Sequence, residues 1–251
     1  MNKKYIFIAN WKLNKSYSES ISWCQDREKL TELATTGNAA HEIVLCPTFP
    51  ALAPMAKLLE DTGILLGAQN CSSHAEGAYT GEVSAKSLKE VGSQFCIIGH
   101  SERRRYFGEN DIDIIQKAKL LLDSKITPIL CTGEEKPFAA SEIEKAIDRL
   151  LAPLSELPHK PMHNRLYIAY EPTWAIGTGK TPPITLLEEI AKYMDIRLKA
   201  LLPNYQIKLL YGGSVDQNNI QAILTIPPMM GALIGGASLD FQNFKNIVCS
   251  I

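Results

Sequence analysis

The chain has 251 residues, of which 45% are hydrophobic and 21% charged, and its formal net charge is -1 at pH 7. This balance is ordinary for a globular protein and excludes the strongly basic surface of a nucleic-acid-binding or membrane-surface protein. No apolar run is long enough to span a bilayer, and the run after the basic N-terminus is too short for a signal peptide. We therefore expect a cytoplasmic protein with neither a membrane nor a nucleic acid as partner.

The cysteines show neither a CxxC motif nor the spacing of a zinc site, and several lie in apolar runs. Such cysteines are typical of buried free thiols in a reducing compartment. We expect this state, and no metal, for Cys24, Cys46, Cys71, Cys96, Cys131 and Cys249.

Strand-like runs alternate with helical patterns from one end of the chain to the other. Several runs are continuously apolar, as expected for strands that are buried on both faces. The predicted strands are 5–12, 42–47, 65–70, 95–100, 126–131, 166–171, 207–211 and 231–235. The predicted helices lie near 17–35, 51–61, 85–91, 111–123, 141–154, 182–202, 217–226 and 239–248.

Eight strand–helix units in a chain of this length predict a (β/α)₈ barrel that occupies residues 1–251 as a single domain. The alternative is an open, doubly wound parallel sheet. Against this alternative, the chain has no early GxGxxG motif, and no Pro-, Gly- or Ser-rich linker marks a second domain. In a barrel, functional residues are expected where strands end and the following loops begin.

The first predicted strand ends in Asn10-Trp11-Lys12. Alternate residues of a strand share a face, so Asn10 and Lys12 are expected to point together and Trp11 away from them. A buried lysine needs a counter-charge or an anionic ligand, and an asparagine amide can donate to a carbonyl oxygen. The alternative is a strand end that simply reaches solvent.

The fourth predicted strand ends at His100. If a helical turn begins at Ser101, its dipole disfavours a protonated imidazole, and a neutral imidazole can donate to a substrate oxygen. Glu102 is a natural partner for a cation such as Lys12. A structural histidine is equally compatible with the pattern, and the arginines at 103–105 fit a salt-bridged helix face better than an anion site.

The sixth predicted strand, 166–171, ends in a carboxylate, Glu171. The loop 172–180 has a stiff start, an apolar middle and a glycine-rich finish, and Thr181 and Pro182 are suited to begin a helix. A carboxylate beside a loop that can close is a way to build a base that works away from water. The alternative is an ordinary loop with a surface glutamate.

Glycines mark the loops after the sixth, seventh and eighth strands. Glycine lets a backbone approach a ligand closely, and exposed N–H groups bind phosphate. The loops after the last two strands of a barrel often form such a site. With a net charge of -1 the protein as a whole does not attract an anion. We therefore expect a local binding site in which backbone N–H groups and Lys12 bind the anion. The candidates are Gly177, Ser214, Gly235 and Gly236.

Five segments together resemble the triosephosphate isomerase family. They are Asn10-Trp11-Lys12-Leu13-Asn14, Gly99-His100-Ser101-Glu102-Arg103-Arg104, Ala169-Tyr170-Glu171-Pro172-Thr173-Trp174-Ala175-Ile176-Gly177-Thr178-Gly179, Tyr211-Gly212-Gly213-Ser214-Val215 and Gly235-Gly236-Ala237-Ser238-Leu239. The motifs occur in the family's order along nearly the whole chain. The resemblance implies a dimeric (β/α)₈ barrel that needs no cofactor. It also implies interconversion of dihydroxyacetone phosphate and D-glyceraldehyde 3-phosphate through an enediolate, in glycolysis and gluconeogenesis.

The resemblance also implies roles for individual residues. Glu171 is the base that takes a proton from the carbon beside the carbonyl, and His100 is the neutral electrophile that moves a proton between the two oxygens. Lys12 neutralises enediolate charge and touches phosphate, with Asn10 helping to hold the oxygen and Glu102 pairing with the lysine. The phosphate-binding backbone is that of Gly177, Ser214, Gly235 and Gly236.

Two loops are assigned by the resemblance alone. The lid comprises Pro172, Thr173, Trp174, Ala175, Ile176, Gly177, Thr178, Gly179 and Lys180, with Ile176 closing over the site. The loop 69–82 resembles the family's dimer loop, which would place Thr80 near Asn10 and Glu102 of the partner subunit. Thr132, Thr173 and Met230 depart from the family's usual residues, and the departures concern local stability and lid kinetics.

Two other functions remain open from the residues alone. The first is a Schiff-base aldolase on the same fold that uses Lys12 as its nucleophile. The second is a catalytically inactive binding or scaffolding protein. Neither accounts for the combination of Lys12, His100 and Glu171.

Overall fold

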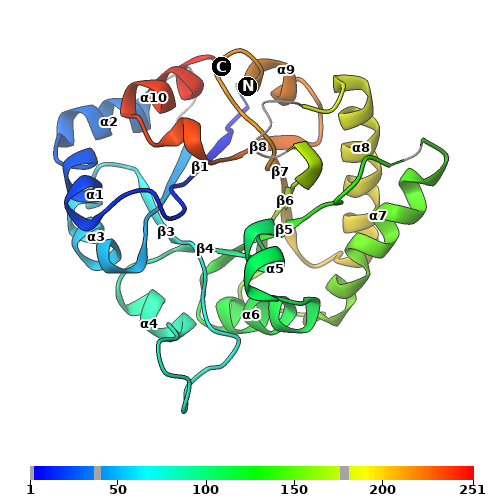
Figure 1. Ribbon diagram of the computed structural model, residues 1–251, viewed down its shortest axis with the longest axis horizontal. Helices are drawn as coiled ribbons and strands as arrows, with labels where there is room; N and C mark the ends of the chain where they lie inside the picture. Colours follow the sequence, from blue (N-terminus) through cyan, green and yellow to red (C-terminus); the bar gives the residue numbers. More distant parts are fainter. Residues whose placement is uncertain (1–2, 37–40, 139, 176–180) are drawn as a thin grey trace.

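Eight parallel strands close into a barrel in which each strand pairs with the next and β8 pairs with β1. In this computed structural model, which describes residues 3–36, 41–138, 140–175 and 181–251, the helices form a ring around the barrel (Figure 1). The predicted (β/α)₈ barrel is confirmed, and the open doubly wound sheet is wrong because no edge strand remains unpaired in the closed sheet.

Each predicted strand has a counterpart in the barrel. The strands are β1 Ile6–Asn10, β2 Glu42–Cys46, β3 Leu65–Ala68, β4 Phe95–Ile98, β5 Thr127–Thr132, β6 Arg165–Tyr170, β7 Gln206–Tyr211 and β8 Met229–Ile234. The first strand ends two residues before its predicted end. The reason is that Lys12 adopts a left-handed backbone conformation with φ 53° and so cannot continue an extended strand.

The α-helices cover the outside of the barrel. They are α1 Tyr17–Trp23, α2 Arg27–Thr35, α3 Leu52–Leu59, α4 Ala85–Glu90, α5 Ser101–Phe107, α6 Asp111–Asp123, α7 Ile143–Leu151, α8 Ile184–Leu201, α9 Ile220–Leu224 and α10 Phe241–Cys249. Short 3₁₀ turns are η1 Phe49–Ala51, η2 Ala140–Glu142, η3 Ala152–Glu156, η4 Thr173–Ala175 and η5 Gly236–Ser238.

One helix prediction was wrong, and another helix begins slightly later than predicted. The helix predicted at 17–35 is two helices, because the Asp26 side chain accepts a hydrogen bond from Lys29 N–H at 3.1 Å and starts a new helix at that point. The helix predicted at 182–202 begins at Ile184. Pro183 disfavours the helical conformation for the residue before it, so Pro182 stays outside the helix.

The barrel interior is filled by apolar side chains from the strands. Its buried core contains Ile6, Ile8, Val44, Cys46, Phe95, Ile97, Ile129, Cys131, Tyr167, Ala169, Leu210 and Leu233. A second, larger core lies between the strands and the helices. The packing leaves no room for a side chain at Gly231, where a Cβ atom would lie 1.9 Å from the Ile6 carbonyl oxygen. The glycine of the family's usual Asp-Gly pair is therefore kept here, although Met230 replaces the aspartate.

A polar cluster lies at the N-terminal end of the barrel, where β2 and β6 begin. Arg165 donates to both carboxylate oxygens of Glu42 at 3.2 and 3.0 Å, and also to the Tyr167 hydroxyl. Tyr167 in turn donates to Glu42 at 2.5 Å, and the ammonium of Lys208 lies 5.7 Å from the centre of its ring. Burial lowers the pKa of Lys208 and raises that of Tyr167. These polar groups bind one another at the N-terminal end of the barrel, opposite to the loops that follow the strands.

The loop between β3 and α4 projects beyond the ring of helices (Figure 1). At its tip, His74 and Tyr79 stack with ring centroids 3.6 Å apart. Ser72 N–H donates to the Val83 carbonyl at 2.8 Å, which closes the base of the loop. Thr80, the predicted dimer-loop contact, lies exposed in this projection.

Among the described residues, no helix is long and apolar enough to cross a membrane. The cysteines are free thiols, and the prediction that they are buried holds for all but Cys249, which is exposed. Burial raises the pKa of Cys24 to about 12, so this thiol stays protonated near neutral pH.

Candidate active site

A cavity of about 220 Å³ opens at the C-terminal end of the barrel. A cavity of this size suits a small metabolite. It is lined by Asn10, Lys12, His100, Glu171, Gly212, Gly213, Ser214, Val215, Leu233, Gly235, Gly236 and Ala237. The structure thus brings together the ends of five strands that the sequence marked with polar residues or glycines. Gly177 lies outside the described residues.

Lys12 reaches the cavity from the turn after β1. Its ammonium lies 2.6 Å from a carboxylate oxygen of Glu102, as predicted from the sequence. We expected strand alternation to orient the Lys12 side chain, but Lys12 lies outside the strand. Its orientation comes from the left-handed turn, in which Lys12 N–H donates to the Asn10 side-chain oxygen at 3.1 Å. Asn10 is 5% exposed, whereas Trp11 is fully buried in the outer core.

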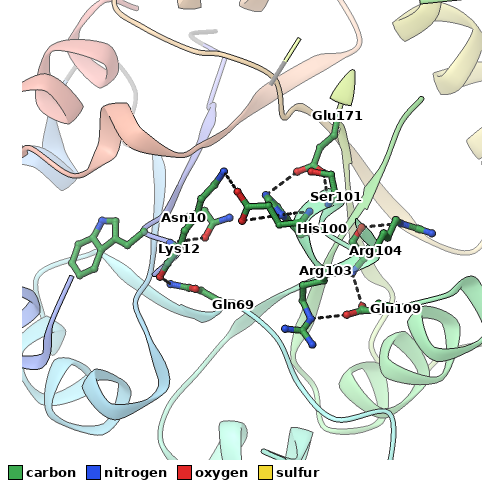
Figure 2. A network of polar contacts seen from close by, with 12 residues as sticks. Asn10, Lys12, Gln69, His100, Ser101, Arg103, Arg104, Glu109 and Glu171 are labelled. Carbon is green, nitrogen blue, oxygen red and sulfur yellow. Dashed lines mark hydrogen bonds and ion pairs between the residues drawn. The ribbon is translucent and has the colours of Figure 1, made fainter. Parts of the chain in front are cut away.

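His100 is the N-cap of α5, which begins at Ser101 as the dipole argument required. Its Nδ1 atom accepts a hydrogen bond from Glu102 N–H at 3.2 Å. A nitrogen that accepts a hydrogen bond carries no proton, so a neutral His100 has its hydrogen on Nε2. This Nε2 atom lies 3.3 Å from Glu171 Oε1 (Figure 2). The imidazole is therefore set to donate on the side that faces the cavity.

Glu171 follows β6 and is 2% exposed. Its Oε2 atom accepts a hydrogen bond from Ser101 N–H at 3.0 Å, so the start of α5 holds one side of the carboxylate. Its Oε1 atom is close to His100 Nε2 but forms no hydrogen bond within the described part of the chain. Oε1 is consequently the oxygen that is available to take up a proton.

The carboxylate of Glu171 is closely surrounded by backbone and sulfur. A Cβ atom at Gly212 would lie 2.7 Å from Glu171 Cγ, and one at Gly133 would lie 1.7 Å from the Glu171 carbonyl oxygen. Burial and the neighbouring Glu171 charge raise the pKa of Cys131 well above its usual range. The thiol of Cys131 therefore remains neutral beside the carboxylate.

The turn that carries His100 is stabilised by a buried ion cluster of Glu109, Arg103 and Lys117. Gly99 has a left-handed φ of 69°, its N–H donates to Glu109 at 3.0 Å, and its carbonyl accepts from Arg104 at 3.0 Å. Glu109 also pairs with Arg103 at 2.6 Å and with Lys117 at 3.0 Å. Arg104 also pairs with Asp111, so two of the arginines at 103–105 form salt bridges. The interpretation as a salt-bridged helix face is confirmed for these two.

The first hinge of the predicted lid is anchored by Glu134. Its carboxylate accepts from the Tyr170 hydroxyl and the Trp174 indole N–H, each at 2.8 Å. Thr173 N–H and hydroxyl both donate to the Glu134 carbonyl, at 3.0 and 2.8 Å. The threonine that departs from the family pattern thus adds a hydrogen bond to the hinge. Burial raises the pKa of Glu134, against the effect of these two side-chain hydrogen bonds.

The rest of the predicted lid is described only in part. Ala175 is buried, and its carbonyl accepts a hydrogen bond from the Ser214 hydroxyl at 3.1 Å. Pro172 precedes the 3₁₀ turn η4 and is buried. The remaining predicted lid residues lie outside the described residues: Ile176, Gly177, Thr178, Gly179 and Lys180.

Sequence reasoning missed several residues of this site. Ser101 N–H binds the carboxylate of Glu171, and Glu109 holds the turn before His100. Gln69 donates to the carbonyl of Lys12 at 2.9 Å. Of these residues only Ser101 directly follows a predicted strand, so only Ser101 had a signal in the sequence. Gln69 lies inside the predicted strand 65–70, and Glu109 lies well after the predicted strand 95–100. The described residues contain no group of three or more His, Cys, Asp or Glu side chains suited to hold a metal ion.

Comparison with known proteins identifies the family of the chain. The model of the triosephosphate isomerase family matches residues 5–251. The chain belongs to the triosephosphate isomerase family. It is an isomerase, and its reaction is the interconversion of dihydroxyacetone phosphate and glyceraldehyde 3-phosphate in glycolysis.

Proteins named triosephosphate isomerase from several bacteria resemble the chain over nearly its full length. The one from Thermus thermophilus is 41% identical, with 96% of each chain covered. Those from Picosynechococcus and Dictyoglomus turgidum are 40% and 39% identical. They cover 98% and 99% of this chain and 98% and 100% of their own length, respectively. The family assignment therefore applies to the whole barrel.

Proposed function

We propose that Glu171, His100, Lys12 and Asn10 carry out the isomerisation in this cavity. The observation that supports the proposal is the pairing of Glu171 Oε1 with His100 Nε2 at 3.3 Å, where both flank one small cavity. Two groups this close can act on neighbouring atoms of one three-carbon ligand.

In the proposed reaction, the Glu171 carboxylate takes a proton from the carbon next to the carbonyl, and an enediolate forms. His100 gives its Nε2 proton to one enediolate oxygen and takes a proton from the other. Glu171 then returns its proton to the neighbouring carbon, which leaves the other carbonyl isomer. Every group ends in its starting protonation state, so no cofactor or metal is required.

Lys12 and Asn10 stabilise the negative charge that develops on the enediolate oxygens. Preorganised charges and donors are effective in such a site because they need no reorganisation during the reaction. The phosphate is held by Lys12 and by backbone N–H groups of Ser214, Gly235, Gly236 and Gly177. In support of this, the Lys12 Cε atom lies 3.3 Å from the position that a Cβ would take on Gly235, so the two approach closely in one cavity.

Replacing Lys12 tests this charge assignment. Lys12→Ala should weaken the binding of phosphoglycolate by about 10- to 100-fold, because a charge-assisted hydrogen bond is lost. It should also lower kcat/KM for dihydroxyacetone phosphate in a coupled assay with glycerol-3-phosphate dehydrogenase. Unchanged phosphoglycolate affinity would contradict the assignment. Trapping of a covalent adduct by borohydride in the unmodified protein would indicate a Schiff-base aldolase instead.

The loop 172–180 is proposed as a lid that closes over the substrate. The enediolate carries phosphate on a neighbouring carbon, and in open water it would eliminate this leaving group. Exclusion of water also strengthens the electrostatic effect of Lys12. The contacts of Glu134 with Tyr170 and Trp174 support a fixed first hinge for such a lid.

We also propose that the protein works as a homodimer. Among the described residues, seven of the ten exposed large hydrophobic side chains lie in the segments that follow β1 to β4. They are Leu13, Tyr17, Phe49, Tyr79, Tyr106, Phe107 and Ile112. Exposed large apolar side chains that gather in the segments after four neighbouring strands are typical of a protein–protein interface. The projecting loop with Thr80 would insert beside the first and fourth strand ends of the partner subunit.

A charge placed on this surface should break the dimer. Leu13 is 94% exposed, and Leu13→Asp should shift the protein from dimer to monomer in light scattering at micromolar concentration, because the interface would bury an unpaired carboxylate. The matched control is Met162→Asp, since Met162 is 87% exposed between η3 and β6. A wild-type protein that is a fully active monomer would refute the proposal.

The proposed location is the cytoplasm, where the glycolytic reaction takes place and where the buried free thiols would stay reduced. The same reaction run in reverse would serve gluconeogenesis. Fractionation of cells that express the tagged protein would test the location, and recovery with membranes or in the medium would contradict it.

A further inference from the structure

Lys12 holds a backbone conformation that a residue with a side chain rarely adopts. Its φ of 53° lies in the left-handed region, which disfavours any residue other than glycine unless surrounding contacts stabilise it. On the N-terminal side, Lys12 N–H donates to Asn10 Oδ1 at 3.1 Å. The carbonyl side of the residue needs a partner of its own to fix the turn.

Gln69 supplies this partner from the end of β3. Its side-chain nitrogen donates to the Lys12 carbonyl at 2.9 Å (Figure 2). The same nitrogen donates to the Cys46 carbonyl at 2.9 Å. Both partners are acceptors, so the amide orientation is fixed: the nitrogen, with its two hydrogens, must face them. The Cys46 carbonyl also accepts from Trp11 N–H at 3.2 Å. One side chain thus joins the ends of β1, β2 and β3.

Together with the Asn10 contact, this hydrogen bond holds the Lys12 peptide on both sides. With the peptide fixed on both sides, the side chain extends across the cavity mouth to Glu102 at 2.6 Å and towards Gly235. If the Lys12 carbonyl lost this hydrogen bond, Lys12 could relax to an ordinary backbone conformation. Its side chain would then point in a different direction. Gln69 itself does not line the cavity.

We propose that Gln69 is a positioning residue for Lys12, acting on the rate through the lysine backbone and not by touching substrate. The inference rests on the proposed role of Lys12. A purely structural glutamine would make a different prediction, because it would affect the protein whether or not a lysine stands at position 12.

The test is a double-mutant cycle on kcat/KM for dihydroxyacetone phosphate. Gln69→Met keeps the side-chain length but removes both hydrogen bonds, and it should lower kcat/KM by about 10- to 100-fold, as expected for a misplaced catalytic group. In the Lys12→Ala background the same change should alter kcat/KM less than twofold. The control is Gln242→Met, an exposed glutamine bonded to Asn246, which should have no effect in either background.

Each result decides between the two roles. An equal loss in both backgrounds, or no loss in either, would overturn the inference. Gln69→Asn is one methylene too short for the two contacts, so it should show the same coupling and provides a second variant should Gln69→Met fail to fold. If Lys12→Ala itself retained full activity, the proposed function of Lys12 would fail, and this result is distinct from an unaffected Gln69→Met.

Discussion

Glu171→Gln should lower kcat for dihydroxyacetone phosphate by about 10²–10⁴-fold, the contribution typical of a positioned general base. Glutamine has nearly the same shape, and its carbonyl oxygen can still accept from Ser101 N–H, as Glu171 Oε2 does at 3.0 Å. The amide cannot take up a proton. Because the proposed phosphate contacts lie elsewhere in the cavity, phosphoglycolate affinity should change only a fewfold.

A matched substitution separates loss of the base from a general effect of removing a carboxylate. Glu60 is exposed between α3 and β3, at the opposite end of the barrel, and Glu60→Gln should leave kcat unchanged. Near-normal turnover by a Glu171→Gln preparation that is free of host isomerase would refute the assignment of Glu171 as the base.

Glu109→Gln should destabilise the protein by about 3–5 kcal/mol at pH 7, because it leaves the buried Lys117 ammonium without its counter-charge. The Glu109 and Lys117 side chains are 3% and 6% exposed, so water cannot replace the lost carboxylate. The change is measured as the free energy of unfolding in urea at one fixed protein concentration, since a dimer makes this quantity concentration-dependent.

The destabilisation should depend on pH in a defined direction. Burial favours the protonated form of Glu109, but the charge of Lys117 together with hydrogen bonds from Lys117, Arg103 and Gly99 outweighs it and lowers the pKa below 4.5. The stability from this carboxylate is therefore present above pH 4.5 and lost as pH falls through the lowered value. The difference between wild type and Glu109→Gln should shrink on acidification.

The matched control is Glu90→Gln, because Glu90 is exposed at the end of α4. Its free energy of unfolding should differ little from that of wild type at any pH. A Glu109→Gln protein as stable as wild type at pH 7 would show that Lys117 does not depend on this ion pair. A difference that grows on acidification would contradict the assigned direction of the pKa shift.

The residues around the cavity could be predicted from sequence because of one property of parallel barrels. The carboxyl ends of all strands meet at the same end, so a polar residue or glycine directly after an apolar run is placed at the cavity by topology alone. His100, Glu171 and Ser214 follow this rule. The strands themselves were recognisable because they are buried on both faces and hence continuously apolar.

Contacts between distant segments could not be predicted in this way. Gln69 and Lys12 are 57 positions apart, and their hydrogen bond depends on a left-handed turn that no local pattern requires at a lysine. The same holds for Glu109 and Lys117, which read in sequence as ordinary surface charges. The break between α1 and α2 was missed because the helical pattern continues on both sides of Asp26, whose side chain starts the second helix.

The polar cluster of Glu42, Arg165 and Tyr167 lies at the N-terminal end of the barrel, which faces away from the cavity. It shares no residue with the cavity lining. The two ends of the molecule can therefore change independently. Selection for heat resistance can act on the N-terminal end and leave the rate of the reaction untouched, while adaptation of the reaction can proceed at the other end without loosening the barrel.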